Sequence, residues 1–225
     1  MGEGMGGAAV AGKREGTMVR VYAIDGVVPY VHPESYVHPT ASLVGDVIVE
    51  AGCYIGPGAS LRGDFGRLVM RRGSNLQDNC IVHGFPRRET VIEEEGHIGH
   101  GAVLHGCRIG RNALIGMSAV IMDDAVIGAD AMVAALAFVK AGFEVPPGTL
   151  AAGIPARVVR ALGEEDRRWK AEATREYQEL ARRSLASMVE TEALRALDAA
   201  RLAQRTKGET GAEPLYLQKK NRSGS

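Results

Sequence analysis

Three histidines, His83, His100 and His105, are the residues of this sequence best suited to hold a catalytic metal ion. Imidazole nitrogens bind zinc at about 2.0–2.1 Å, and three of them leave a fourth position open for water. A water molecule in that position loses a proton near neutral pH and becomes a nucleophile. A single histidine is more often an ordinary surface residue, so the prediction depends on whether the fold brings these three together.

The elements that would position the histidines follow a six-residue repeat. Aliphatic residues recur at this period in several runs, and a small side chain stands four residues after most of them. The aliphatic positions are Val37, Leu43, Val49, Ile55, Leu61, Met70, Leu76, Val82, Ile92, Ile98, Leu104, Ile109, Ile115, Ile121, Ile127, Val133 and Val139. The period is typical of a short strand and turn, and three such units close one triangular coil of about eighteen residues. The sequence therefore predicts a parallel β-helix, with another type of β-helix or an ordinary sandwich left open.

The repeat also assigns residues to faces of the coil. Two steps of the repeat, after Leu61 and after Val82, are longer than six residues and predict inserted loops. When these insertions are allowed for, Leu61, Val82 and Leu104 share one face on successive coils. His83 and His105 each follow one of these residues, so they should point outward, one above the other, and share one ion.

His100 falls on the neighbouring face, around the corner of the prism, because it stands two residues after Ile98. It cannot join His83 and His105 within one chain. A neighbouring subunit packed by threefold symmetry would present His100 to them. We therefore expect the metal to lie between the subunits of a homotrimer.

Composition excludes several classes of function. Lys+Arg and Asp+Glu balance at 27 each, which leaves no excess positive charge for a nucleic-acid partner. The longest apolar run, Met132 to Val139, is far shorter than the roughly 20 residues that span a bilayer, so no membrane association is expected. Cys53, Cys80 and Cys107 are odd in number and form no CxxC pair, which favours a reducing compartment and a cytoplasmic location.

The chain divides into four segments. Residues 1–17 are rich in Gly and Ala and predict a disordered extension, and residues 18–160 form the β-helix domain. Residues 161–205 predict a C-terminal helix or helices, and residues 206–225 a flexible tail. The helical stripe is Trp169, Ala173, Tyr177, Leu180, Ser184 and Met188.

Segments 62–64, 75–83 and 99–107 closely resemble the γ-class carbonic anhydrase family of hexapeptide-repeat proteins. The resemblance covers roughly residues 19–159 and implies an all-β, left-handed parallel β-helix that assembles as a homotrimer. It also implies that zinc, or alternatively iron or cobalt, is held by His83 and His105 of one subunit and His100 of its neighbour.

The same resemblance suggests roles for other residues. Arg62, Asp64 and Asp78 match an interface ion network of the family. The alternative is that these residues only fix the subunit register, and for Asp64 that interpretation is as good as a catalytic role. Gln77 matches a residue that orients the metal-bound water. Phe65 stands where the archetypal carbonic anhydrase has a glutamate, which argues against efficient CO2 hydration.

Segments 96–117, 137–150 and 169–183 resemble the phenylacetic acid degradation proteins and, less closely, a carnitine-operon relative. This resemblance extends to about Ser184. It makes Tyr177 a candidate for the metal pocket, although the place of Tyr177 on the helical stripe favours a packing role.

Three enzyme functions remain open. The first is a metal-dependent hydrolase of acyl-CoA thioesters in phenylacetate-type aromatic catabolism. The second is a carbonic anhydrase that interconverts CO2 and bicarbonate, and the third is a CoA-dependent hexapeptide acyltransferase with a histidine base and no metal. Three histidines that meet at one point argue against the third, because a transferase needs only one base. A non-catalytic assembly scaffold is the remaining alternative.

Overall fold

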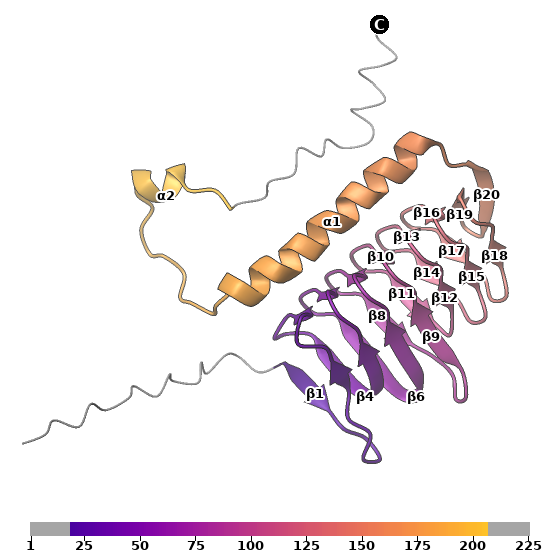
Figure 1. The fold of residues 1–225 in the computed structure, drawn as a ribbon, viewed down its shortest axis with the longest axis horizontal. Coiled ribbons are helices and arrows are strands. Elements are labelled where there is room, and N and C mark those ends of the chain that lie inside the picture. The colour runs from indigo at the N-terminus through magenta and orange to yellow at the C-terminus, as the bar shows by residue number, and fades with distance from the viewer. Residues whose placement is uncertain (1–18, 207–225) are drawn as a thin grey trace, which may run out of the picture.

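The computed structural model describes residues 19–206, which form a left-handed parallel β-helix with a long helix beside it (Figure 1). The predicted extension at residues 1–17 and nearly all of the predicted tail lie outside this range. Within residues 19–206, no helix has the length and apolar character needed to cross a bilayer.

Most strands are short, as the six-residue repeat predicts, and each occupies one side of a coil. The strands are β1 (Arg20–Tyr22), β2 (Tyr30–Val31), β3 (Tyr36–Val37), β4 (Ser42–Val49), β5 (Tyr54–Ile55), β6 (Ser60–Met70), β7 (Asn75–Leu76), β8 (Ile81–His83), β9 (Glu89–Ile92), β10 (His97–Ile98), β11 (Val103–His105), β12 (Arg108–Ile109), β13 (Leu114–Ile115), β14 (Val120–Ile121), β15 (Val126–Ile127), β16 (Met132–Val133), β17 (Phe138–Val139), β18 (Glu144–Val145), β19 (Thr149–Gly153) and β20 (Ala156–Ala161). The helices are α1 (Glu164–Ser187) and α2 (Ala199–Ala203).

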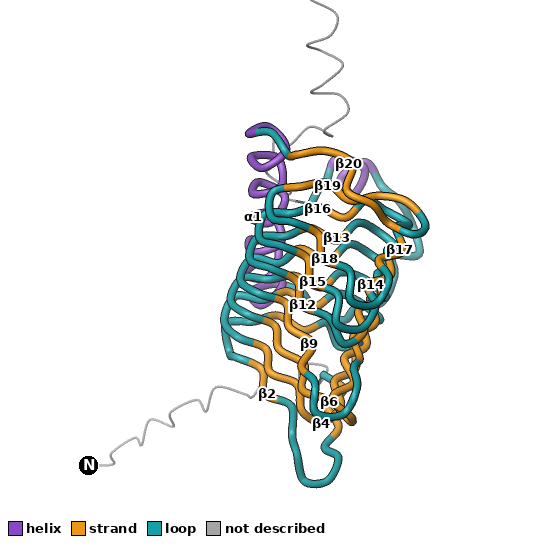
Figure 2. Tube along the Cα trace, turned by 90° about the vertical axis from the view of Figure 1, so that its right-hand side faces the viewer, coloured by secondary structure: helices purple, strands orange, loops and turns teal. Residues whose placement is uncertain are grey.

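The strands stack in three parallel faces, coil upon coil (Figure 2). One face runs from β6 through β8, β11 and β14 to β17, and a second runs from β6 through β9, β12 and β15 to β18. The third contains β3, β5, β7, β10, β13, β16 and β19. The first two faces are joined because β6 pairs with β8 at its start and with β9 at its end.

The two long steps of the repeat differ in structure. The step after Leu61, predicted as an inserted loop, is instead the continuous strand β6, which turns the corner of the coil beside β4. The step after Val82 does contain a loop, at residues 84–88. The first insertion lies on the coil next to that of His83 and the second follows His83 itself, so both shape the surroundings of the predicted metal site.

The core is one continuous column of aliphatic side chains inside the coil. The small residues of the repeat are also fully enclosed, including Cys53, Cys80 and Ala102 at 0% exposure. Cys53 and Cys80 therefore pack inside the coil at small positions of the repeat. Burial raises the pKa of the Cys80 thiol to about 11 and that of Cys107 to about 12, which disfavours a thiolate.

The coil ends one strand after Pro146 and Pro147, which follow β18. Strand β19 still pairs parallel with β16, and the chain then folds back as β20, which pairs antiparallel with β19. Strand β20 leads into α1, which begins after Gly163. Three acidic residues stand in its first turn, where they interact favourably with the helix dipole.

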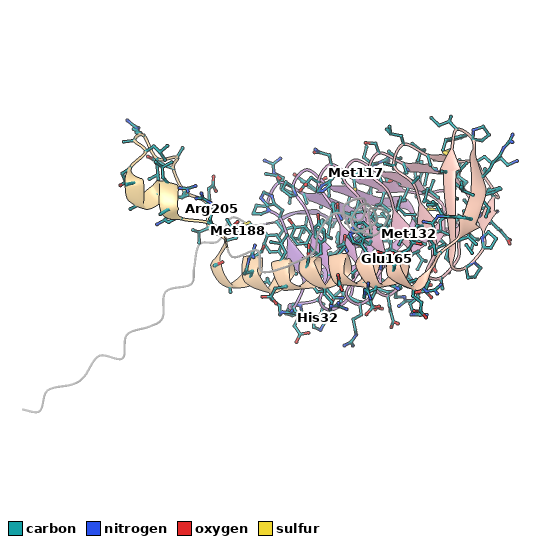
Figure 3. All side chains as sticks on the ribbon, turned by 90° about the horizontal axis from the view of Figure 1, so that it is seen from above. His32, Met117, Met132, Glu165, Met188 and Arg205 are labelled. Atoms are coloured by element: carbon teal, nitrogen blue, oxygen red, sulfur yellow. The ribbon has the colours of Figure 1, made fainter. Side chains whose placement is uncertain are left out.

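Helix α1 runs back along the coils from β20 toward the N-terminal strands, where it contacts β3, β5 and β7 (Figures 1 and 3). The buried side chains of α1 are Asp166, Lys170, Thr174, Ala181 and Ser184. The predicted stripe is thus wrong in part, because Trp169 and Ala173 are only half-buried while polar residues face the coil.

These polar residues find partners on the turns of the coil. The Lys170 ammonium donates to the Glu95 carbonyl at 2.6 Å and to Asn112 Oδ1 at 2.5 Å, and Gln178 Nε2 donates to the Gly73 carbonyl at 3.1 Å. Burial lowers the pKa of Lys170 to about 7. The helix is therefore attached by hydrogen bonds that a hydrophobic pattern does not reveal.

Candidate functional site

His83 and His105 lie side by side on adjacent coils, in the register that coil counting predicts. Strands β8 and β11 place His83 Nδ1 at 3.1 Å from His105 Nε2, with the ring centroids 5.1 Å apart. Two nitrogens across a tetrahedral zinc ion are separated by a similar distance, about 3.3 Å. The pair is therefore spaced as two ligands of one ion would be.

His100 stands on a different face, after strand β10. Its Nδ1 donates to Asp78 Oδ2 at 2.6 Å, and its side chain is 46% exposed. Among residues 19–206, no three His, Cys, Asp or Glu side chains converge within one chain to hold a metal. The three-histidine ligand set accordingly stays a prediction that requires a second subunit.

One ring nitrogen of each of the three histidines lies within hydrogen-bond distance of an aspartate carboxylate. His83 Nε2 lies 3.0 Å from Asp64 Oδ1, and His105 Nδ1 lies 2.6 Å from Asp123 Oδ1. The third pair is the His100 and Asp78 contact described above. Histidines that bind metals usually donate their other ring N–H to such a partner, which fixes the ring and makes the ligating nitrogen more basic.

This arrangement fits a cation between His83 and His105. If both outer nitrogens donate to their aspartates, the two inner nitrogens face one another with lone pairs at 3.1 Å. That contact is repulsive unless a proton or a metal ion lies between the rings. Imidazole donors suit zinc, iron and cobalt, which are the predicted metals.

The predicted ion network is divided between two faces within one chain. Arg62 Nη1 donates to Asp64 Oδ2 at 2.6 Å, so Asp64 joins Arg62 to His83. Desolvation opposes ionisation of Asp64, but hydrogen bonds from Arg62 and His83 lower its pKa below the usual value. Asp78 contacts His100 on the other face and would meet this group only across a subunit boundary.

Gln77 lies in a buried polar cluster beneath α1 and is only 3% exposed. Its amide donates to Asn75 Oδ1 at 3.1 Å and to His97 Nε2 at 2.8 Å. The other nitrogen of His97 faces Thr174 Oγ1 at 3.4 Å. The role of Gln77 in orienting water stays a prediction, and within one chain its amide is held by His97 rather than by the His83 pair.

Tyr177 combines the two predicted roles. Its ring packs against Tyr54 and His97, with centroids 5.4 and 5.3 Å away. Its hydroxyl lies 3.5 Å from His100 Nε2, at the upper limit of a hydrogen bond. Burial raises the pKa of Tyr177 well above its usual value, so the hydroxyl keeps its proton.

Sequence reasoning missed Asp123 and His97. Asp123 could have been found, because Ile121 pairs with Leu104 one coil below, which places Asp123 above His105. Gly106 makes this contact possible, since a Cβ atom there would collide with the Asp123 carboxylate. His97 gave no signal, because its function depends on the helix that covers it.

Burial makes the stability of this helix interface sensitive to acid. Desolvation lowers the pKa of His97 from 6.5 to about 3, so the native state keeps His97 neutral. The unfolded state takes up a proton below pH 6.5, so stability present above that pH is lost as the pH falls toward 3. We expect the free energy of unfolding of the wild type to fall by about 1.4 kcal/mol more per pH unit in this window than that of His97→Gln. Urea unfolding at several pH values measures both slopes, and parallel slopes would contradict the assignment.

Comparison with known proteins adds sequence and structural relatives. Residues 106–141 match the family model "Bacterial transferase hexapeptide (six repeats)". The carnitine operon protein CaiE of Citrobacter koseri is 56% identical over 193 residues, which cover 86% of this chain and 97% of that protein. CaiE of Salmonella newport is 53% identical over 197 residues, covering 88% of this chain and 98% of that protein.

Two solved structures share the fold at moderate identity. A Bacillus cereus protein described as a candidate acetyltransferase has a TM-score of 0.74 and 32% identity, covering 75% of this chain and 98% of its own. A hexapeptide transferase family protein from Anaplasma phagocytophilum has a TM-score of 0.70 and 34% identity, covering 72% of this chain and 96% of its own.

Proposed function

Because the chain belongs to the γ-carbonic anhydrase-like hexapeptide-repeat family that includes CaiE, we propose that it is a metal-dependent hydrolase of acyl-CoA thioesters. The proposed enzyme is a homotrimer, with His83 and His105 of one subunit and His100 of the next around each ion. The observation that carries the proposal is the aspartate on each of these histidines, at 2.6–3.0 Å from a ring nitrogen.

Exposed apolar side chains support a second copy of the chain as the partner. The face that carries His83 and His105 also presents an outward column of Ile81, Val103, Val120 and Phe138, of which Ile81 is 48% exposed. At the corner of His100, the next coils carry Met117, 56% exposed (Figure 3), and Leu136, 68% exposed. Packing the corner of one subunit on the face of the next would bury both sets and carry His100 to the histidine pair.

In the proposed reaction, the metal, the three aspartates and Tyr177 have separate roles. A divalent metal at this site supplies a Lewis acid and lowers the pKa of water that it binds. Asp64, Asp78 and Asp123 hold protons at the outer nitrogens of the histidines, so that the inner nitrogens remain free to ligate. Tyr177 keeps its proton and is placed beside His100 to donate to an oxyanion that forms on the thioester carbonyl.

The relatives point to a different metabolic setting from the one that the sequence predicts. The sequence segments favour phenylacetate-type catabolism, with a carnitine-operon protein as the more distant relative. The relatives described above are instead carnitine operon proteins at 53–56% identity. We therefore place the proposed thioesterase in carnitine metabolism, with a carnitine-related acyl group as the substrate class.

The test measures thiol release from a panel of acyl-CoA thioesters by the metal-loaded protein. We expect turnover that falls at least about 1,000-fold in His105→Ala, because losing a ligand removes both the ion and its activated water. His32→Ala is the matched control, because His32 lies on the first coil of the β-helix and outside this site. Chelated wild-type protein should behave like His105→Ala and recover on metal addition.

Two other results would replace the proposal. CO2 hydration without thiol release, measured on the same preparation, would favour a carbonic anhydrase. Acyl transfer to an acceptor that chelation leaves undiminished would favour a transferase, the activity named for the family model and for the Anaplasma structure.

A further inference from the structure

Four aromatic rings form a row along the outer surface of the coil. Phe65 packs on His83 with centroids 5.4 Å apart, His83 on His105 at 5.1 Å, and Phe85 on His105 at 5.2 Å. The histidine pair therefore lies between two phenylalanines. Within a single subunit Phe65 is 59% exposed and Phe85 54% exposed, so each ring covers a histidine and still presents part of its surface.

The local backbone conformation positions Phe65 and Phe85 beside the two histidines. Phe65 precedes Gly66 in β6, and Phe85 is the second residue of the loop at residues 84–88. A Cβ atom on Gly66 would collide with the carbonyl oxygens of Phe85 and Arg88, so the loop lies directly against the strand. Arg87 adopts a φ of 62°, a left-handed conformation that a non-glycine residue seldom takes. The close approach of the loop therefore depends on glycine at position 66 and on the left-handed turn at Arg87.

The chemistry of the row limits what it can recognise. Phenylalanine rings offer no hydrogen-bond donor or acceptor, but their faces carry negative charge density that attracts cations. A primary ammonium group that packed against these rings would lose hydrogen bonds to water and gain none from the rings. A quaternary ammonium has no N–H group to satisfy, and its methyl groups suit an apolar surface.

The neighbouring charges also permit a cation. Arg62 and Arg88 are each engaged by a carboxylate, of Asp64 at 2.6 Å and of Asp124 at 2.7 Å. Asp64 and Asp123 contact the two histidines, and their negative charges offset the positive charge of the metal that the proposed function places between His83 and His105. A positively charged substrate group at the rings thus meets aromatic faces whose neighbouring arginines are paired with carboxylates.

We infer that Phe65 and Phe85 bind the quaternary ammonium end of the acyl group and so determine substrate specificity. This inference rests on the proposed function, which supplies a carnitine-related acyl thioester and places its carbonyl at the histidines. The trimethylammonium end of a short acyl chain would lie against a phenylalanine while the carbonyl lies at the neighbouring histidine. A role in binding the ammonium group also accounts for the apolar ring at position 65. The archetypal carbonic anhydrase has a glutamate there, which favours CO2 hydration.

The test is calorimetric binding of two isosteric probes to the full chain. One probe is L-carnitine, and the other is its carbon isostere, in which an uncharged tert-butyl group replaces the trimethylammonium group. We expect L-carnitine to bind the wild type at least about 10-fold more tightly, because only the charged probe gains the attraction to the rings. Because one trimethylammonium group lies against one ring, at least one of Phe65→Leu and Phe85→Leu should weaken L-carnitine by about 2- to 30-fold while changing the isostere less.

Matched variants separate ring chemistry from structural damage. Phe65→Tyr and Phe85→Tyr keep an aromatic face and should retain the preference, which covers the case in which a leucine variant fails to fold. Tyr30→Leu removes an exposed aromatic side chain in β2, away from the row, and should leave both affinities unchanged. Thermal unfolding confirms that the compared variants are folded.

The outcomes distinguish this inference from the proposed function. Equal binding of the two probes, equal losses of both in the leucine variants, or no binding of L-carnitine would each overturn the inference, even if thiol release is normal. A preference for L-carnitine that is lost with Phe65 or Phe85, in a protein without thioesterase activity, would support the inference and refute the proposed reaction.

Discussion

Mixed trimers of His83→Ala and His100→Ala subunits are expected to recover metal that neither variant binds alone. His83 and His100 lie on different faces of one coil, and in a threefold ring each face meets the corner of the next subunit. In every mixed trimer, one of the three interfaces then pairs an intact His83 and His105 with an intact His100. Metal analysis of separately tagged subunits, refolded together and purified through both tags, measures the recovery.

Two controls make this result specific. A mixture of His83→Ala with His105→Ala offers no intact histidine pair at any interface, so it should stay without metal. A mixture of His32→Ala with wild type should bind metal fully, since His32 lies outside the site. Mixed trimers that form but contain no metal would show that the ligands are not shared, and a fully metallated monomer would show the same.

The fold could be predicted in detail because the coil repeats one local rule. Each six-residue unit buries an aliphatic side chain and a small one, so the same pattern fixes strand, turn and face. The count holds through two insertions and places His83 opposite His105 in the observed register. The first insertion differs from the prediction. The longer step after Leu61 was expected to be a loop, but β6 continues through it as a strand.

The helix was less predictable because its contacts do not follow hydrophobicity. Lys170 is 1% exposed, although lysine is among the residues least often buried. Its ammonium is satisfied by a carbonyl on one turn of the coil and an amide on the next, which a helical pattern alone does not show. His97 was missed for the same reason, because its partners Gln77 and Thr174 come from the neighbouring coil and from α1.

The site itself was predictable only for residues at fixed positions of the repeat. His83, His100 and His105 each occupy an outward slot, and so does Asp78. Asp123 occupies a comparable slot, but one carboxylate among many on a charged surface has no distinguishing pattern until a histidine lies beneath it. Its contact with His105, made possible by Gly106, therefore provides a test of the metal centre that does not require mixing two kinds of subunit.

Asp123→Asn is expected to weaken metal binding about 10- to 100-fold with little effect on folding of the metal-free chain. The wild-type carboxylate accepts the Nδ1 proton of His105 at 2.6 Å and leaves Nε2 free to ligate. An asparagine amide is neutral and can present either its oxygen or its NH2 group, so it makes His105 less basic and no longer fixes the tautomer. Titration against a chromophoric chelator measures the affinity, and urea unfolding of the metal-free protein measures stability.

Asp124→Asn provides the matched control because it makes the same chemical change one residue away. Asp124 pairs with Arg88 at 2.7 Å and is 52% exposed, so its loss removes a surface ion pair and leaves His105 untouched. Exposed ion pairs contribute only about 0–1 kcal/mol, and metal affinity should stay at the wild-type value. Equal affinities in the two variants would mean that Asp123 does not position a metal ligand, whereas a loss confined to Asp123→Asn identifies His105 as one.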